Sequence, residues 1–397
     1  MKVCFDTFGC RLNRAEALQQ EARFIASGWE VTKSHADADA IVVRCCAVTA
    51  RAQRDCEKLI AHLKKKYPNA KLLIEGCTDK RIRSAIIERT LIKEADAPVS
   101  TRTARAYLKV QDGCSGKCTF CIVPQFRGKS VSVDFEEAIG KANRFIEAGY
   151  REIVVTGCNL SLYASNGKRL PDLLAALAAL NPSTRIRLGS LEPGICDDEA
   201  ISVMAENANI CRFLHLPIQS GSNVILSAMR RPYLIRDIDK LVRKAVELMP
   251  NLGLGCDLMT GFPGESQFDF LATQTLLKRL PFNNAHIFAY SERPGTTAAK
   301  FSNQIPRDIR SERAHELAKI ADLNRANYAK KFIGRKVAII IEDEERGIGW
   351  TGEYLRCETM HAGIGSYRPK RRELVTFRIS ETKNGVLRGL PISPHGR

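Results

Sequence analysis

Three closely spaced cysteines, Cys114, Cys118 and Cys121, lie in the segment QDGCSGKCTFCIVP. Thiolates spaced as C-x3-C-x2-C are suitable ligands for an iron-sulfur cluster. A cube of four irons needs four ligands, so a loop with three cysteines leaves one iron open to coordinate something other than protein. A structural zinc site is the alternative, but zinc prefers paired CxxC or CxxH elements, and no second pair occurs nearby. The loop therefore predicts an iron-sulfur centre with one open position.

The spacing of this loop, with Phe120 directly before its last cysteine, resembles the radical S-adenosylmethionine superfamily. The resemblance implies a 4Fe-4S cluster whose open iron is chelated by the amino and carboxylate groups of S-adenosylmethionine. An electron from the cluster then breaks a C–S bond of that cofactor. The implied metal ligands are Cys114, Cys118 and Cys121, and Phe120 is implied to lie beside the cofactor.

Three other cysteines follow three predicted strands in the first hundred residues. Hydrophobic runs predict strands at 3–8, 40–44 and 72–75. Helices are expected at 15–27, with Asn13 as N-cap, and at 50–65. Strands alternating with helices indicate a small parallel sheet, and ligands gather at the carboxyl edge of such sheets. Just past the three strands, at this edge, are Cys10, Cys46 and Cys77.

The segments FGCRLNRAEA, RCCAVTARA and IEGC resemble the cysteine-bearing segments of the methylthiotransferases. That family pairs such a domain with a radical loop, which implies an auxiliary 4Fe-4S cluster on Cys10, Cys46 and Cys77. The choice of Cys46 over Cys45 rests on the following Ala47-Val48-Thr49, which matches the family in that register. Neighbouring side chains on a strand point to opposite faces, so Cys45 is not expected to serve the same metal. We interpret Cys45 and Cys56 as packing residues or spectators.

The central part of the chain again alternates strand and helix. Strands are expected at 107–111, 152–156, 186–189, 213–218, 254–259 and 285–290. Six such units indicate a partial (β/α)6 barrel, whose catalytic residues come from the carboxyl ends of the strands. The family resemblance continues through HLPIQSGSNVILSAMRR and GFPGE. From those positions we expect five residues around S-adenosylmethionine: Thr156, Glu192, Gln219, Ser220 and Asp257.

Two features near the barrel mouth leave alternatives open. Cys158 stands in TGCN, where relatives carry an apolar residue, and we interpret it as a spectator and not as a metal ligand. Arg127 and Lys129 in FRGKS come just after the cysteine loop, where they can meet substrate phosphate. The alternative for both cations is a solvated turn.

The last part of the chain changes character after a long charged helix expected at 306–331. Short β-like runs from residue 336 predict a compact antiparallel barrel. The segments WTGEYLRC and VLRGLPI resemble the TRAM domain, an RNA-binding appendage of tRNA-modifying enzymes. A basic patch beside Tyr367 can neutralise phosphates while the aromatic ring stacks on an unpaired base, although it can also be a loop that merely stays solvated. The patch consists of Arg368, Lys370, Arg371 and Arg372.

These observations predict an α/β protein of three parts. A small parallel-sheet domain, Rossmann- or flavodoxin-like, is expected at 1–98 with the auxiliary cluster. A partial (β/α)6 TIM-like radical barrel with its trailing helix is expected at 99–331. A small antiparallel β-barrel of the TRAM type is expected at 332–397.

Charge and composition set the cellular context. The formal charge is +17, from 61 Lys and Arg against 44 Asp and Glu, which favours a polyanionic partner over general solubility alone. Fourteen cysteines in 397 residues are too sparse for a disulfide scaffold, and their clustering favours metal in a reducing compartment. No signal peptide or long apolar run is evident. We expect a monomeric cytoplasmic protein without a membrane partner.

The opening TFGCRLN is most similar to the family members that act on threonylcarbamoyladenosine in tRNA. The resemblance implies transfer of a methylthio group to adenine C2 beside the anticodon, with the anticodon stem-loop as partner and an external electron donor and sulfur source. A second S-adenosylmethionine is implied to supply the methyl group. Alternatives are an enzyme of the same family for isopentenyladenosine or for a ribosomal-protein aspartate, and a noncatalytic metal-containing RNA-binding protein.

Overall fold

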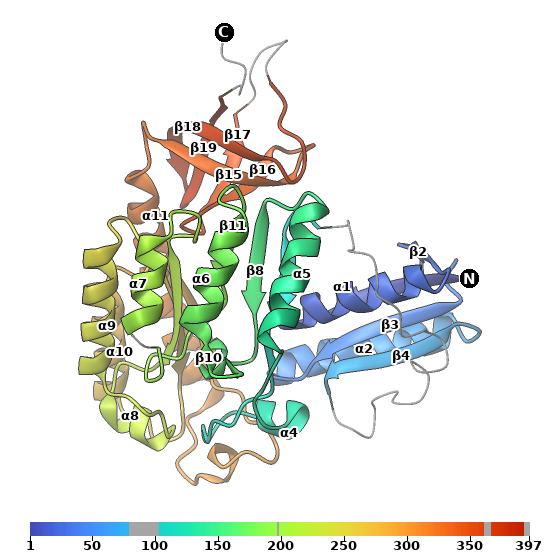
Figure 1. Cartoon of the computed structure of the whole chain (residues 1–397). Coiled ribbons are helices and arrows are strands. Elements are labelled where there is room, and N and C mark those ends of the chain that lie inside the picture. Colours follow the sequence, from blue (N-terminus) through green and yellow to red (C-terminus); the bar gives the residue numbers. More distant parts are fainter. Residues whose placement is uncertain (79–102, 197, 361–366, 393–397) are drawn as a thin grey trace.

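The computed structural model describes residues 1–78, 103–196, 198–360 and 367–392 (Figure 1). Its first part is a parallel sheet in the order β2-β1-β3-β4. These strands are β1 (Lys2–Thr7), β2 (Glu30–Thr32), β3 (Ala40–Cys46) and β4 (Lys71–Cys77). The helices are α1 (Arg11–Ala26) and α2 (Ala50–Lys66). The edge strand β2 is absent from the sequence prediction because a segment of three residues is too short to show the hydrophobic pattern of a strand.

The two helices cover opposite faces of this sheet. Val42 and Leu73 pack with Phe24 of α1, whereas Val43 and Ile74 pack with Leu63 of α2. All of β3 is buried, as expected for a central parallel strand covered on both faces. This two-sided cover fixes the register of β3 and β4, and therefore the positions of the residues at their carboxyl ends.

The prediction that Asn13 caps the first helix is wrong. The helix begins at Arg11, with Cys10 at its N-cap, so Asn13 lies inside the first turn. Its side chain is fully buried, and its amide donates to the carbonyl oxygens of Phe8 and Cys45, at 2.8 Å each. The amide therefore ties the start of the helix to the ends of β1 and β3 and does not cap its own backbone.

The central part is a partial barrel of parallel strands, which confirms the predicted (β/α)6 core. Sheet order is β5-β8-β11 and β12-β13-β14. Isolated parallel bridges pair Ile186 of β11 with Ile210, before β12, and Ser190, after β11, with His215 of β12. The barrel strands are β5 (Ala106–Lys109), β8 (Glu152–Thr156), β11 (Arg185–Leu188), β12 (Phe213–Gln219), β13 (Gly253–Thr260) and β14 (Asn284–Ala289). The outer helices are α5 (Phe135–Glu147), α6 (Leu170–Leu180), α7 (Asp198–Glu206), α9 (Ile235–Leu248) and α10 (Gln267–Arg279).

Shorter elements lie in the connections between the barrel strands and helices. They are the strands β6 (Gln111–Asp112), β7 (Val131–Ser132), β9 (Ala164–Ser165) and β10 (Lys168–Arg169), the helices α4 (Val123–Arg127) and α8 (Asn223–Ala228), and single 3-10 turns at Leu160–Leu162 and Ala298–Lys300. Outward-facing Val, Ile and Leu side chains of the strands form the main core with the helices. The alternate positions of these strands point away from that core and carry polar side chains, among them Glu152, Arg187, His215 and Asp257.

A long helix, α11 (Arg307–Lys330), leads to a closed antiparallel-rich barrel at one end of the central domain (Figure 1). The order β15-β16-β17-β19-β18 confirms a small C-terminal β-barrel. Its strands are β15 (Lys336–Asp343), β16 (Ile348–Thr351), β17 (Arg356–Thr359), β18 (Leu374–Lys383) and β19 (Val386–Pro391). The turn after β16 reaches the central barrel, where Tyr354 packs 4.8 Å from Phe213, measured between ring centroids.

The expected domain boundary at residues 98 and 99 lies outside the described residues. Within the described ranges, no helix combines the length and apolar character needed to span a membrane.

Candidate functional site

The cysteine loop sits between β6 and α4, at the carboxyl edge of the barrel. Thr119 anchors it, since its backbone N–H donates to Met229 and its hydroxyl to Ala228, at 3.1 and 2.9 Å. A Cβ atom at Gly116 would lie 3.2 Å from Cys114 Sγ and 3.9 Å from Cys118 Sγ. The backbone therefore runs close to both sulfurs, and both thiolates are near enough to Cys121 to raise its pKa.

The chemistry of these thiols fits a metal cluster. Burial raises the pKa of Cys121 to about 12 and also raises the pKa of Cys118, whose thiolate Arg231 partly stabilises. Such thiols stay protonated at neutral pH unless a cation ionises them, and iron bound to the three sulfurs would supply that positive charge. The three residues therefore suit a 4Fe-4S cluster and would be its protein ligands.

Arg231 is a site residue that sequence reasoning missed. Its guanidinium lies 3.1 Å from Cys118 Sγ and 2.5 Å from Glu192 Oε1, and it donates to the Tyr233 hydroxyl at 2.7 Å. Hydrogen bonds to cluster sulfurs tune the reduction potential of iron-sulfur centres. The only sequence signal was its place at the end of HLPIQSGSNVILSAMRR, because Cys118 and Glu192 are far away in the chain.

The residues expected around S-adenosylmethionine are spread over the carboxyl edge. Glu192 is joined to the cysteine loop through Arg231, and burial raises its pKa against the effect of that cation. Thr156 ends β8 and is buried, while Gln219 ends β12 with a φ of +75°. Ser220 is fully buried, with its hydroxyl 3.3 Å from that of Thr273 on α10, so its side chain supports the turn behind the strand.

Asp257 and Phe120 have other side-chain partners. The Asp257 carboxylate lies 3.1 Å from ring nitrogens of both His215 and His286. Burial would raise the pKa of Asp257, but the hydrogen bonds from the two histidines hold it well below its ordinary range. Phe120 packs against Phe262, with ring centroids 6.5 Å apart, in a small apolar cluster. Both residues stay predicted cofactor contacts.

The three N-terminal cysteines gather at the carboxyl edge of the first sheet. Cys46 and Cys77 are the last residues of β3 and β4 and are partners in the register of the two strands. Gly9, at a φ of +95°, passes so close to Cys46 that a Cβ atom there would be 2.9 Å from its sulfur. Cys10 follows directly and is exposed. Only glycine permits this approach, which places Cys10 beside the other two thiols.

These thiols also fit a second cluster. Burial, together with the nearby thiolates of Cys77 and Cys10, raises the pKa of Cys46 to about 11. Burial likewise raises the pKa of Cys77, although Arg127 opposes the effect. Cys45 is in register with Gly76 instead, and it is buried with Cys56 in the core under α2. Of the two adjacent cysteines at the end of β3, Cys46 therefore stays the proposed metal ligand and Cys45 does not.

Arg127 joins the two groups of cysteines. It ends α4, directly after the cysteine loop, and its Nε lies 2.9 Å from Cys77 Sγ. Its other nitrogens bind Asn13, Glu16 and Asp112 at 2.7 to 3.0 Å. The side chain is only 5% exposed, so it does not offer a free cation to phosphate, contrary to our expectation. Lys129 is exposed, as a phosphate contact requires.

Replacing Arg127 with glutamine should loosen this junction. Burial would raise the pKa values of Glu16 and Asp112, but Arg127 and Lys109 lower both, that of Asp112 to about 2. Removing the guanidinium leaves two carboxylates short of a partner, at a cost of about 3 kcal/mol in unfolding free energy. Urea unfolding and iron content after reconstitution measure the effect. Lys129→Gln is the matched control, and equal behaviour of the two variants would contradict the bridging role.

Cys158 lies beside this junction. Its thiol is 3.6 Å from Asp112 Oδ1, and burial raises its pKa despite the nearby Arg127. The interpretation of Cys158 as a spectator stays a prediction.

The C-terminal basic patch is smaller than expected. Arg368, Lys370 and Arg371 are exposed. Arg372 instead lies over the Tyr150 ring, 4.3 Å from its centroid, and donates to the carbonyl oxygen of Thr103, so it joins the C-terminal β-barrel to the central domain. The Tyr367 hydroxyl donates to Glu373 at 2.6 Å, and the residue packs against the core of the C-terminal barrel. Stacking of its ring on a base stays a prediction.

Comparison with known families supports this architecture. Residues 108–277 match the radical SAM superfamily, and residues 2–96 match the model described as Uncharacterized protein family UPF0004. A solved radical S-adenosylmethionine methyltransferase from Kitasatospora setae, with tryptophan and a cofactor analogue bound, shares the fold with a TM-score of 0.53 and 12% identity over 72% of each chain.

Curated relatives match over most of the chain. The threonylcarbamoyladenosine tRNA methylthiotransferase MtaB of Bacillus subtilis is 31% identical over 89% of both chains. MtaB of Aquifex aeolicus is 32% identical over 87% of this chain and 94% of its own. A tRNA-2-methylthio-N(6)-dimethylallyladenosine synthase of Methylacidiphilum infernorum is 31% identical over 98% of this chain and 94% of its own. The chain therefore belongs to the methylthiotransferase family of radical S-adenosylmethionine enzymes, which binds this cofactor at a 4Fe-4S cluster.

Proposed function

We propose that the enzyme adds a methylthio group to C2 of threonylcarbamoyladenosine beside the anticodon of tRNA. The observation that carries this proposal is the contact of Arg127 with Cys77, because it holds the two cysteine groups at one junction. Adenine C2 is an aromatic carbon without useful acidity, so a side-chain base cannot activate it. The bound cofactors would supply radical cleavage of S-adenosylmethionine and the transferred sulfur.

The chain itself holds and positions these parts. Cys114, Cys118 and Cys121 would bind the S-adenosylmethionine cluster, and Cys10, Cys46 and Cys77 an auxiliary 4Fe-4S cluster. Arg231 places a buried guanidinium against the sulfur of Cys118 in the first group. Arg127 does the same at the sulfur of Cys77 in the second group. The exposed residues Arg368, Lys370 and Arg371 would bind the anticodon stem-loop through its phosphates. The electron donor and the sulfur source would be external, and the active form a monomer.

A cavity beside Cys10 favours threonylcarbamoyladenosine over isopentenyladenosine. It measures about 440 Å³ and lies where α1, β5 and the turn after β16 meet. Arg11 lies over the Tyr354 ring at 4.8 Å and Arg14 over the Tyr107 ring at 5.8 Å. Among the described residues, neither arginine forms an ion pair. The threonylcarbamoyl group carries a carboxylate, which a guanidinium can bind through paired hydrogen bonds, whereas an isopentenyl group does not.

The test uses enzyme reconstituted anaerobically with iron and sulfide, then incubated with dithionite, S-adenosylmethionine and tRNA bearing either nucleoside. Mass spectrometry of the digested nucleosides should show a methylthio gain on threonylcarbamoyladenosine. Arg11→Gln should lower kcat/KM for this tRNA about 10- to 100-fold, because a hydrogen bond to a charged group is lost. Arg23→Gln, at the exposed far end of α1, is the control. Modification of isopentenyladenosine alone would overturn the substrate assignment.

A further inference from the structure

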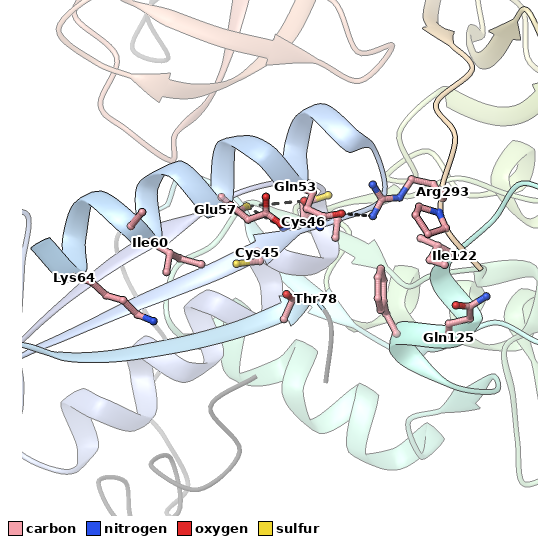
Figure 2. A pocket seen from close by; sticks show the side chains of 15 residues that line it. Cys45, Cys46, Gln53, Glu57, Ile60, Lys64, Thr78, Ile122, Gln125 and Arg293 are labelled. Atoms are coloured by element: carbon pink, nitrogen blue, oxygen red, sulfur yellow. Dashed lines mark hydrogen bonds between the residues drawn. The ribbon is translucent and has the colours of Figure 1, made fainter. Parts of the chain in front are cut away.

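A second cavity, of about 550 Å³, lies beside Cys46 between α2 and the segment that carries Arg293 (Figure 2). Three sulfurs line it, those of Cys45, Cys46 and Cys56. Much of the remaining wall is apolar, with Ile60, Ile122, Phe126 and Pro294 among its residues. Glu57 and Lys64 of α2 are also lining residues. The cavity therefore combines thiols with apolar and charged side chains, next to a proposed ligand of the auxiliary cluster.

Cys56 is the thiol best placed to work with Cys46. It projects from α2, and its sulfur accepts the backbone N–H of Cys46 at 3.5 Å. The side chain is buried against Cys45 but reaches the cavity. An atom bound to this sulfur on the cavity side would lie beside Cys46. The methylthiotransfer reaction as derived above gives Cys56 no role.

Arg293 supplies a buried positive charge at the same cavity. The residue is only 6% exposed, and its Nη2 donates to Gln53 of α2 at 2.5 Å (Figure 2). Its Nε lacks a hydrogen-bond partner among the described residues. Buried N–H groups are nearly always paired, so this unpaired donor points to a missing anionic ligand. Arg293 and Lys64 are the cations among the residues that line the cavity. A buried guanidinium beside apolar side chains suits a soft, weakly hydrated anion better than phosphate, which needs several donors.

We propose that this cavity receives the sulfur used by the reaction, as a small hydropolysulfide anion, and that Cys56 accepts one sulfur atom as a persulfide. The Cys56 sulfur attacks a sulfane sulfur of the anion, a new S–S bond forms, and the old S–S bond breaks. The shortened hydropolysulfide leaves with the electron pair and takes the thiol proton, so no net oxidation occurs. Arg293 pairs with the anion during this exchange. The inference rests on the proposed function because Cys46 is placed there as a cluster ligand.

The test treats reconstituted holoenzyme with a small excess of sodium tetrasulfide, followed by alkylation, tryptic digestion and mass spectrometry. Trypsin separates Cys56, on residues 55–58, from Cys45 and Cys46, on residues 45–51. We expect the mass of one extra sulfur atom on 55–58, and its persistence in Cys45→Ser. It should be absent in Cys56→Ser and form about tenfold more slowly in Arg293→Gln, because a charge-assisted hydrogen bond is lost.

Cys256 is the internal control, because it is fully buried in the radical barrel core and should remain unmodified. Iron content and the far-ultraviolet circular dichroism spectrum report whether each variant folds, and Arg293→Gln leaves every thiol in place. Labelling of Cys256 to the same extent, no sulfur on 55–58, or an unchanged rate in folded Arg293→Gln would each overturn the proposal. The readout needs no tRNA. Labelled Cys56 without any tRNA modification would contradict the proposed substrate and leave this site standing.

Discussion

Replacing Cys118 with alanine should reduce 5′-deoxyadenosine formation from S-adenosylmethionine to the level seen without enzyme. The loop offers three thiolates, and the loss of one removes a ligand that the cluster needs for a single open iron. The change also removes the sulfur that Arg231 contacts at 3.1 Å. Anaerobic incubation with dithionite, followed by chromatography of the nucleoside products, measures the effect. Methylthiolation of tRNA should disappear with it.

Cys77→Ala is the matched variant in the other cysteine group. It should retain measurable 5′-deoxyadenosine formation and lose methylthiolation, because the loop at Cys114, Cys118 and Cys121 remains complete. Iron content should fall from two clusters per chain toward one. Cys357→Ala, in the core of the C-terminal β-barrel, should change neither reaction. Normal methylthiolation by Cys77→Ala would show that the auxiliary-cluster assignment is wrong.

Replacing Glu152 with glutamine should lower the free energy of unfolding by about 3 to 5 kcal/mol, the cost of breaking a buried ion pair. Glu152 is fully buried, and its carboxylate accepts from Arg187 at 2.7 Å and from Arg185 at 2.9 Å. The same two arginines donate to backbone carbonyls of the C-terminal barrel, Arg187 to Thr351 at 2.7 Å and Arg185 to Ala338 at 3.0 Å. The change therefore leaves two buried cations uncompensated at the contact between the two domains.

The effect should depend on pH. Burial would raise the pKa of Glu152, but Arg187 and Arg185 hold it well below its ordinary value of 4.5. A carboxylate with a lowered folded-state pKa stabilises the protein fully above its unfolded-state pKa and loses this contribution as the pH falls through the folded-state value. The stability difference between wild type and Glu152→Gln should thus be constant near neutral pH and shrink below about pH 4.

Urea unfolding at several pH values checks this prediction. Glu137→Gln, which breaks a half-exposed pair with Lys141 one helical turn away, is the control and should cost less than about 1 kcal/mol. A Glu152 variant as stable as this control would mean that the buried network contributes little. A difference that grows in acid would contradict the direction of the pKa shift.

The sequence by itself determined the order of the elements and the six proposed metal ligands. Buried parallel strands produce continuous apolar runs, so β3 and β8 could be predicted within about two residues at each end. The cysteines were evident because each group depends on local spacing or on its place after a strand. Residues such as Cys46 and Cys77 are positioned by backbone register, which follows from the strands themselves.

Only the tertiary structure decided which charged side chains are free. Arg127 and Arg372 look in the sequence like exposed phosphate ligands, yet one is buried against Cys77 and the other lies over Tyr150. Arg231 gave no sequence signal as a neighbour of Cys118, 113 positions away. A guanidinium is long and finds its partner through space, so its role depends on which distant carboxylates, thiols and rings the packed domains bring within reach.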